Sequence, residues 1–131
     1  MGESARPRPG TAGSEVSDFL DTAFSRPDPG TVVLEVRGEI DTLTAPAFTA
    51  AAEELVAAPG EVLVMDLTEV RFLASSGLAV LISAAQRAEE RGVRLRLVVA
   101  SRAVRRPLEI TGTAALFDLH SEPESAYGGR D

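Results

Sequence analysis

One segment of the chain carries the strongest structural signal: VLVMDLTEVRFLASSGL, residues 62–78. It opens on four consecutive apolar residues, 62–65, with Leu67 following a single Asp66. The run is too short for a typical helix, and its valines favour a strand that is buried on both faces of a sheet. Strands of that kind belong to α/β folds, so the segment predicts the centre of an α/β sheet.

The second half of the segment predicts a helix start that carries two hydroxyl groups. We expect residues 68–71 to turn the chain, residues 72–73 to return to apolar surroundings, and a helix to follow. Ser75 and Ser76 then lie at the helix N-terminus, where unpaired N–H groups and a partial positive charge accept a capping oxygen or a phosphate. From the residues alone, one of the serines is a helix cap or a phosphoacceptor.

The flanking sequence predicts how this strand is joined to others. Prolines and a glycine at residues 26–30 predict a turn between two strands, and therefore an antiparallel hairpin. Val33 is expected to face the helices, with Leu34 as a further candidate. Later strands alternate with helices. The expected strands are 16–25, 31–37, 62–67, 93–100 and 116–119, and the expected helices are 46–57, 77–91 and 102–110, with a last helical turn at 121–124. The prediction is an α/β fold: a mixed four- to five-stranded sheet, a β-hairpin followed by βαβ units, with helices mainly on one face.

Composition sets the domain boundaries. Residues 1–15 are rich in proline, glycine and small polar residues, so we expect a disordered N-terminal tail. Residues 16–126 form the expected folded domain, and residues 127–131 a flexible C-terminal end.

Enzyme chemistry lacks its usual groups. The chain has no cysteine and one histidine, His120, which alone cannot build a metal cluster or a hydrolase triad. Ala74 stands where the hydrolase pattern G-x-S-x-G around Ser76 needs glycine, and no phosphate-binding glycine motif occurs. We expect no enzyme activity, no catalytic residue, no metal site and no cofactor.

Charge and hydropathy limit the partners. The net charge of −7 argues against direct nucleic-acid binding, and no apolar run reaches the roughly 18 residues of a membrane span. We therefore expect no membrane contact and a cytoplasmic protein. Residues 28–69 hold nine acids against Arg37, and residues 87–106 hold seven arginines against two glutamates, which predicts one acidic and one basic face.

Two motifs resemble a known family. DLTEVRFLASSGL, residues 66–78, is similar to the signature of STAS-domain anti-sigma factor antagonists, and GEIDTLTAP, residues 38–46, resembles the same family's second motif. The resemblance covers roughly residues 17–125 and implies a STAS-like fold. It also implies a binding module that engages an anti-sigma factor, commonly a serine kinase, until phosphorylation blocks binding and a serine phosphatase restores it.

The resemblance also implies site residues. The family's phosphoacceptor is the serine immediately before the glycine, which is Ser76. The implied partner-binding residues are Asp41, Thr44, Ala74, Ser75, Ser76, Gly77 and Leu78. Many family members carry aspartate at the position of Ala74. On local grounds, Asp41 can instead form a turn, and Thr44 or Thr42 can cap the helix that follows.

Two wider expectations complete the interpretation. We expect the free protein to be a monomer. The alternative function is a STAS-domain adaptor in a transporter or a stress-signalling scaffold that does not use phosphorylation.

Overall fold

The structure, a computed structural model, describes residues 20–127, and five strands in it form one sheet. The strands are β1 (Leu20–Asp28), β2 (Thr31–Ile40), β3 (Val62–Leu73), β4 (Arg96–Val98) and β5 (Asp118–His120). Their order in space is their order in the chain. β1 and β2 are antiparallel, and β2 to β5 are parallel, so the predicted mixed sheet is confirmed with five strands.

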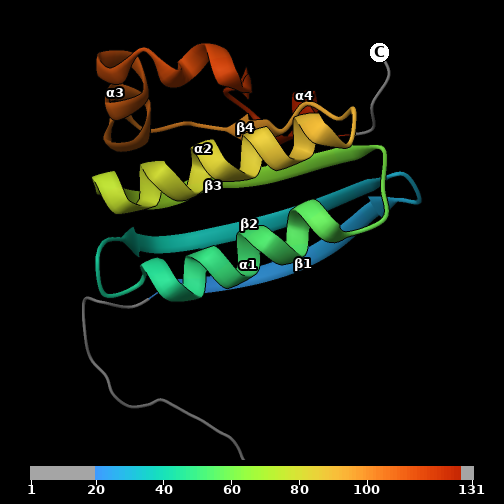
Figure 1. Cartoon of the computed structure of the whole chain (residues 1–131), viewed down its shortest axis with the longest axis horizontal. Helices are drawn as coiled ribbons and strands as arrows, with labels where there is room; N and C mark the ends of the chain where they lie inside the picture. Colours follow the sequence, from blue (N-terminus) through green and yellow to red (C-terminus); the bar gives the residue numbers. More distant parts are fainter. Residues whose placement is uncertain (1–19, 128–131) are drawn as a thin grey trace, which may run out of the picture.

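The helices follow the parallel strands. They are α1 (Ala45–Ala57), α2 (Ser75–Glu90), α3 (Arg102–Thr111) and the short α4 (Pro123–Ala126), with a 3₁₀ turn, η1, at Thr113–Leu116. Figure 1 shows α1 and α2 side by side over one face of the sheet. α1, α2 and α3 each begin just after the carboxyl end of a strand, so three helix starts lie at one end of the sheet.

The two faces of the sheet carry different clusters. Val32, Leu34 and Val36 of β2 join the main core, together with apolar residues of α1, α2 and α3. Val33 lies on the opposite face, in a smaller cluster that contains Ala126 of α4. The prediction that Val33 faces the main helices is wrong, whereas Leu34, the further candidate, does face them. Successive residues of a strand alternate between faces, and both neighbours of Val33 face the main core.

β3 is longer than predicted. The expected turn at residues 68–71 lies inside the strand, where pairing with β2 shifts its register. The Asp66 carboxylate accepts hydrogen bonds from the Thr68 N–H, at 3.0 Å, and from the Thr68 hydroxyl. Hydrogen bonds of this kind are common in turns and here form within a β-bulge. The residues that predicted a turn therefore lie at an irregularity of the strand and not at its end.

Other boundaries also shift. β1 continues to Asp28, whose carboxylate accepts 3.0 Å hydrogen bonds from the Gly30 N–H and the Thr31 hydroxyl, so the hairpin turn is tighter than expected. β4 and β5 are short, and β5 starts after η1. Residues 16–19 of the predicted first strand, the predicted tail at 1–15 and residues 128–131 lie outside the described residues.

Tyr127, which packs against the smaller cluster that contains Val33 and Ala126, should make the stability of the fold depend on pH. Burial, with the nearby carboxylates of Asp66, Glu35 and Glu124, raises the pKa of the Tyr127 phenol above its ordinary 10.0. The folded protein therefore holds the phenol proton more tightly than the unfolded chain, and the free energy of unfolding should fall as pH rises above that value. Between about pH 9 and about pH 11, the unfolding midpoint should fall further for the wild type than for Tyr127→Phe. Equal losses in the two proteins would show that Tyr127 is not the group responsible.

Candidate functional site

The β2–α1 and β3–α2 junctions lie side by side. The Ala74 N–H, after β3, donates a 2.8 Å hydrogen bond to the Ile40 carbonyl at the end of β2. Ile40 pairs with Leu73 in the parallel register that these strands share. Figure 1 places both junctions at the same end of the sheet. The fold thus brings together the residues of the two motifs, which are far apart in sequence.

The β2–α1 junction is a closed local network. The Asp41 carboxylate accepts 3.0 Å hydrogen bonds from the N–H groups of Leu43 and Thr44. The buried Thr44 hydroxyl donates to the Glu39 carbonyl at 2.8 Å and accepts from the Asp41 N–H at 2.9 Å. Asp41 is therefore the turn former that local chemistry suggested, with a half-buried side chain.

The expected threonine cap is wrong. Thr44 occupies the N-cap position of α1, but its side chain makes no capping hydrogen bond. The hydroxyl is used by the junction network instead, so it fixes the shape of the turn that Asp41 belongs to.

The serine pair starts α2 without capping it. Ala74 holds the N-cap position, and Ser75 and Ser76 are the first two helical residues. Ser75 is exposed and Ser76 is half-buried. The Ser76 Oγ is covered and has no hydrogen-bond partner among residues 20–127. The expectation that one serine caps the helix is therefore wrong.

The Ser76 hydroxyl makes no hydrogen bond within residues 20–127 that would stabilise the fold. A covered polar group without a partner typically costs about 1–3 kcal/mol, so alanine at this position would be at least as stable. Ser76 lies in the first turn of α2. The first hydrogen bond of this helix runs from the Leu78 N–H to the Ala74 carbonyl, so the N–H groups before Leu78 have no helical partner. Such unpaired N–H groups favour a negative charge nearby. The serine is thus better explained by chemistry at its hydroxyl than by packing.

Gly77 and Leu78 support this helix start from beneath. Both are buried. A Cβ on Gly77 would lie 2.8 Å from Leu73 Cδ1 and closer still to Ile40 Cγ2. The absent side chain lets α2 begin directly against the ends of β2 and β3, so Gly77 serves the close packing of this chain.

Gly77→Ala should destabilise the protein by about 1–3 kcal/mol despite the better helix propensity of alanine, because the added Cβ overpacks the contact. Ile40→Ala removes the nearest clashing atom, so the double variant should lose less stability than the sum of the two single losses. Urea unfolding monitored by circular dichroism gives the free energy of unfolding of the wild type, the two single variants and the double variant. Ser76→Ala serves as a control at the neighbouring position. Strict additivity of the two losses would contradict the packing argument.

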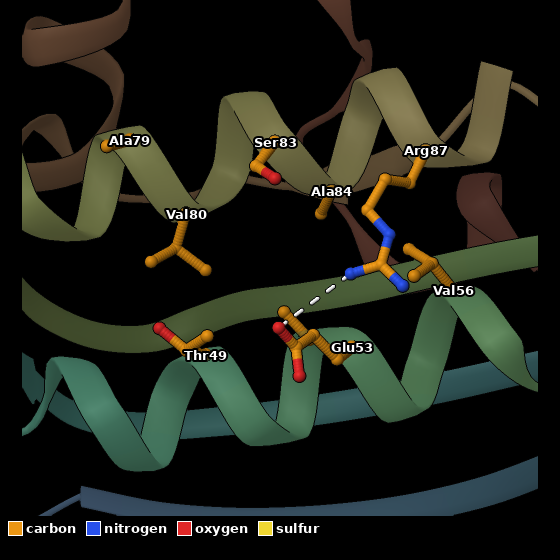
Figure 2. A pocket seen from close by; sticks show the side chains of 9 residues that line it. Thr49, Glu53, Val56, Ala79, Val80, Ser83, Ala84 and Arg87 are labelled. Carbon is orange, nitrogen blue, oxygen red and sulfur yellow. Dashed lines mark ion pairs between the residues drawn. The ribbon is translucent and has the colours of Figure 1, made fainter. Parts of the chain in front are cut away.

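A cavity lies between α1 and α2, beyond the serine pair. It has a volume of about 220 Å³ and is mostly apolar. Figure 2 shows Arg87 of α2 reaching toward Glu53 of α1 across one end, where their charged atoms are 3.8 Å apart. The hydroxyl groups of Thr49 and Ser83 also line it. Within residues 20–127, no group of three or more His, Cys, Asp or Glu side chains could hold a metal ion.

Three exposed apolar residues near the junctions were missed from the sequence. Leu43 of the β2–α1 junction is 73% exposed, Ile110 of α3 is 68% exposed, and Phe72 at the end of β3 is 49% exposed. The expectation that Phe72 returns to apolar surroundings is wrong. The bulges in β3 change its alternation, and the sequence alone gave no signal of that change.

A mixed sheet with a serine-bearing helix start next to the β2–α1 turn defines a STAS domain. The sequence matches the STAS domain family over residues 25–126, and the chain belongs to this family. No helix within the described part of the chain is long and apolar enough to cross a membrane.

Similar proteins carry a consistent name. The chain is 36% identical over 97 residues to the anti-sigma-F factor antagonist RsfB of Mycobacterium tuberculosis, covering 74% of this chain and 79% of that protein. It is 36% identical over 92 residues to an anti-sigma-B factor antagonist of Listeria monocytogenes, covering 70% and 81%. The crystal structure of an anti-sigma factor antagonist from Mycobacterium paratuberculosis superposes with a TM-score of 0.78 at 33% identity, covering 86% and 95%. The resemblance seen in the motifs is confirmed.

Proposed function

We propose that the protein is an anti-sigma factor antagonist that binds an anti-sigma factor while Ser76 is unphosphorylated and releases it when Ser76 carries phosphate. The observation that supports this most strongly is the Ser76 hydroxyl, which lies in the first turn of α2 without a hydrogen-bond partner among the described residues. The names of the similar proteins support the same function.

The position of Ser76 suits a switch that changes a surface and leaves the fold intact. Phosphate adds a charge of about −1.5 to −2, and a helix N-terminus accommodates negative charge. The Oγ is covered, so in this proposal phosphoryl transfer follows a movement that exposes it, such as rotation of χ1 to another staggered position. No hydrogen bond to a described residue opposes that rotation.

The implied partner-binding residues divide by burial. Asp41, Ala74, Ser75 and Ser76 are exposed or half-buried and form the proposed contact surface. Thr44, Gly77 and Leu78 are buried and fix its shape. Ala74 offers no carboxylate to a kinase, so recognition in this proposal depends on Asp41 and the backbone of the helix start.

The proposed partners are an anti-sigma factor that is also a serine kinase and a serine phosphatase that restores binding. We further propose that the free protein is a monomer in the cytoplasm, the compartment of the transcription machinery that sigma factors serve.

The phosphoacceptor can be tested directly. Pull-down with the wild type identifies the anti-sigma kinase, and incubation of the purified pair with ATP, followed by mass spectrometry of the phosphopeptide, should place phosphate on Ser76. Ser76→Asp should weaken binding by at least about tenfold, measured by isothermal titration calorimetry. Its free energy of unfolding should change by less than about 1 kcal/mol, since helix N-termini tolerate negative charge.

Ser75→Ala is the matched control for the phosphorylation site, because it removes the neighbouring exposed hydroxyl and should leave phosphorylation of Ser76 unchanged. Phosphate on Ser75, or undiminished binding by Ser76→Asp, would contradict the proposal.

The covered Ser76 Oγ also favours a second candidate, a STAS adaptor that does not use phosphorylation. A partner that binds the wild type, Ser76→Ala and Ser76→Asp equally, and transfers no phosphate from ATP, would support the adaptor.

We also propose that the domain has no enzyme activity of its own. The only histidine, His120, lies on β5 and not at the serine junction. Its ring forms a hydrogen bond with Ser125 and lies 3.4 Å from the carboxylate of Asp118. Hydrolysis of p-nitrophenyl acetate and of ATP by the purified protein should not exceed that of Ser76→Ala. Turnover that Ser76→Ala abolishes would overturn this prediction.

A further inference from the structure

An apolar groove lies between the end of β3 and α3. It is lined by Phe72, Leu73, Ala103, Pro107, Ile110 and two arginines, Arg102 and Arg106. Its lining is almost wholly apolar apart from those arginines, and Phe72 and Ile110 are largely exposed. Large apolar side chains gathered in one open groove are typical of a surface that another macromolecule covers.

The two arginines of the groove are exposed and unpaired within the part of the chain that the structure describes. Arg102 and Arg106 lie one turn apart on α3, and both are exposed. Neither makes an ion pair or hydrogen bond with a residue of the described chain, whereas the intervening Arg105 donates a 3.1 Å hydrogen bond to the Val99 carbonyl. The groove therefore presents two positive charges that have no ion-pair partner among residues 20–127, next to an apolar floor.

The groove is continuous with the serine junction. Leu73, which lines it, directly precedes Ala74 and contacts the space beside Gly77 at the start of α2. A partner helix or strand that reaches Ser76 from the α3 side would cover Phe72 and Ile110 as well. The apolar surface and the phosphoacceptor thus belong to one end of the molecule.

We propose that this groove is the second part of the partner interface and receives an amphipathic helix of the anti-sigma factor. The apolar side of that helix packs on Phe72, Pro107 and Ile110, and its acidic side chains pair with Arg102 and Arg106. The inference rests on the proposed function and names the chemistry that the partner must present. Ser76 then controls binding, and the groove sets which anti-sigma factor is bound.

The charges argue against a second copy of this chain as the occupant. In a symmetric dimer, the same patch contacts itself, so the arginines of the two grooves would be brought together. Like charges opposed across an interface disfavour association. An acidic helix instead removes apolar surface from water and neutralises both arginines.

The test uses the purified full-length chain and the purified anti-sigma kinase identified with the wild type. Ile110→Gln, and separately the double variant Arg102→Gln with Arg106→Gln, should each weaken binding about tenfold or more in isothermal titration calorimetry. Both changes are at exposed positions, so the thermal midpoints should stay at the wild-type value. Hydrogen exchange of the complex should show protection of residues 71–74 and 102–111.

Two control variants match these changes. Leu116→Gln alters an exposed apolar residue that lies beside Gly92 and Val93, past the far end of α2. That end is about 21 Å from Ser76, since Glu90 lies 14 residues further along α2 and the helix rises about 1.5 Å per residue. Arg87→Gln removes an exposed arginine from the α1–α2 cavity. Neither control should change the dissociation constant by more than about twofold.

The outcomes separate this inference from the proposed function. If Ser76→Asp weakens binding but the groove variants bind as the wild type does, the groove proposal is wrong and the proposed function stands. If the controls weaken binding as much as the groove variants, the groove has no special role and the proposal is overturned. If sedimentation shows a wild-type dimer that Ile110→Gln dissociates while kinase binding is unchanged, a second copy covers the groove and the proposal is likewise overturned.

Discussion

The hydrogen bond from the Ala74 N–H to the Ile40 carbonyl joins the two junctions on which the site depends. It continues the parallel pairing of β2 and β3 to the last residue of each strand, so the two chain segments leave the sheet together. α1 and α2 therefore start next to each other. Gly77 is part of the same constraint, because only a residue without a side chain lets α2 begin against Ile40 and Leu73.

Within that rigid frame, Ser76 is the residue that the fold does not use. Thr44 and Asp41 satisfy one another and the backbone around them, while the Ser76 Oγ has no hydrogen-bond partner among the described residues. The side chains that shape the junction are thus hydrogen-bonded, whereas the one hydroxyl proposed to be phosphorylated has no hydrogen-bond partner among the described residues. A modification there changes charge and bulk without breaking a described hydrogen bond. This separation explains how a phosphate could act on a partner's binding and leave the domain folded.

The sequence was sufficient for the architecture and insufficient for its irregular parts. The apolar run at residues 62–65 and the helical spacing after Ser76 predicted the central strand and α2, because burial imposes those periodicities directly. The Asp66–Thr68 bulge was misread, since the same side-chain-to-backbone hydrogen bonds form in turns and in bulged strands. The exposure of Phe72 follows from the altered alternation after that bulge, so it could not be derived without the register.

The hydrogen-bond partners of the serine and threonine side chains could not be predicted from the sequence either. Serine and threonine favour N-cap positions, yet Ala74 takes that position at α2, and Thr44 directs its hydroxyl to the Glu39 carbonyl. Capping preferences are worth about 1 kcal/mol, so the packing of Gly77 and the junction network can override them. The candidate site residues were identified from the motifs, whereas their separation into a proposed contact surface and buried support needed the fold.

The order of the strands gives the proposed interface a charge gradient. β3 lies between β2 and β4. The Ser76 junction therefore lies between the end of β2 with the turn after it, where Glu39 and Asp41 stand, and the first half of α3, which holds Arg102 and Arg106. Of the uneven charges seen along the sequence, these four lie at this end of the molecule. A phosphate on Ser76 would add negative charge between the two carboxylates and the two arginines, and so bring negative charge closer to the arginines. A partner whose charges complement the unmodified gradient would then lose complementarity at the centre of its contact, where a charge change has the largest effect on binding.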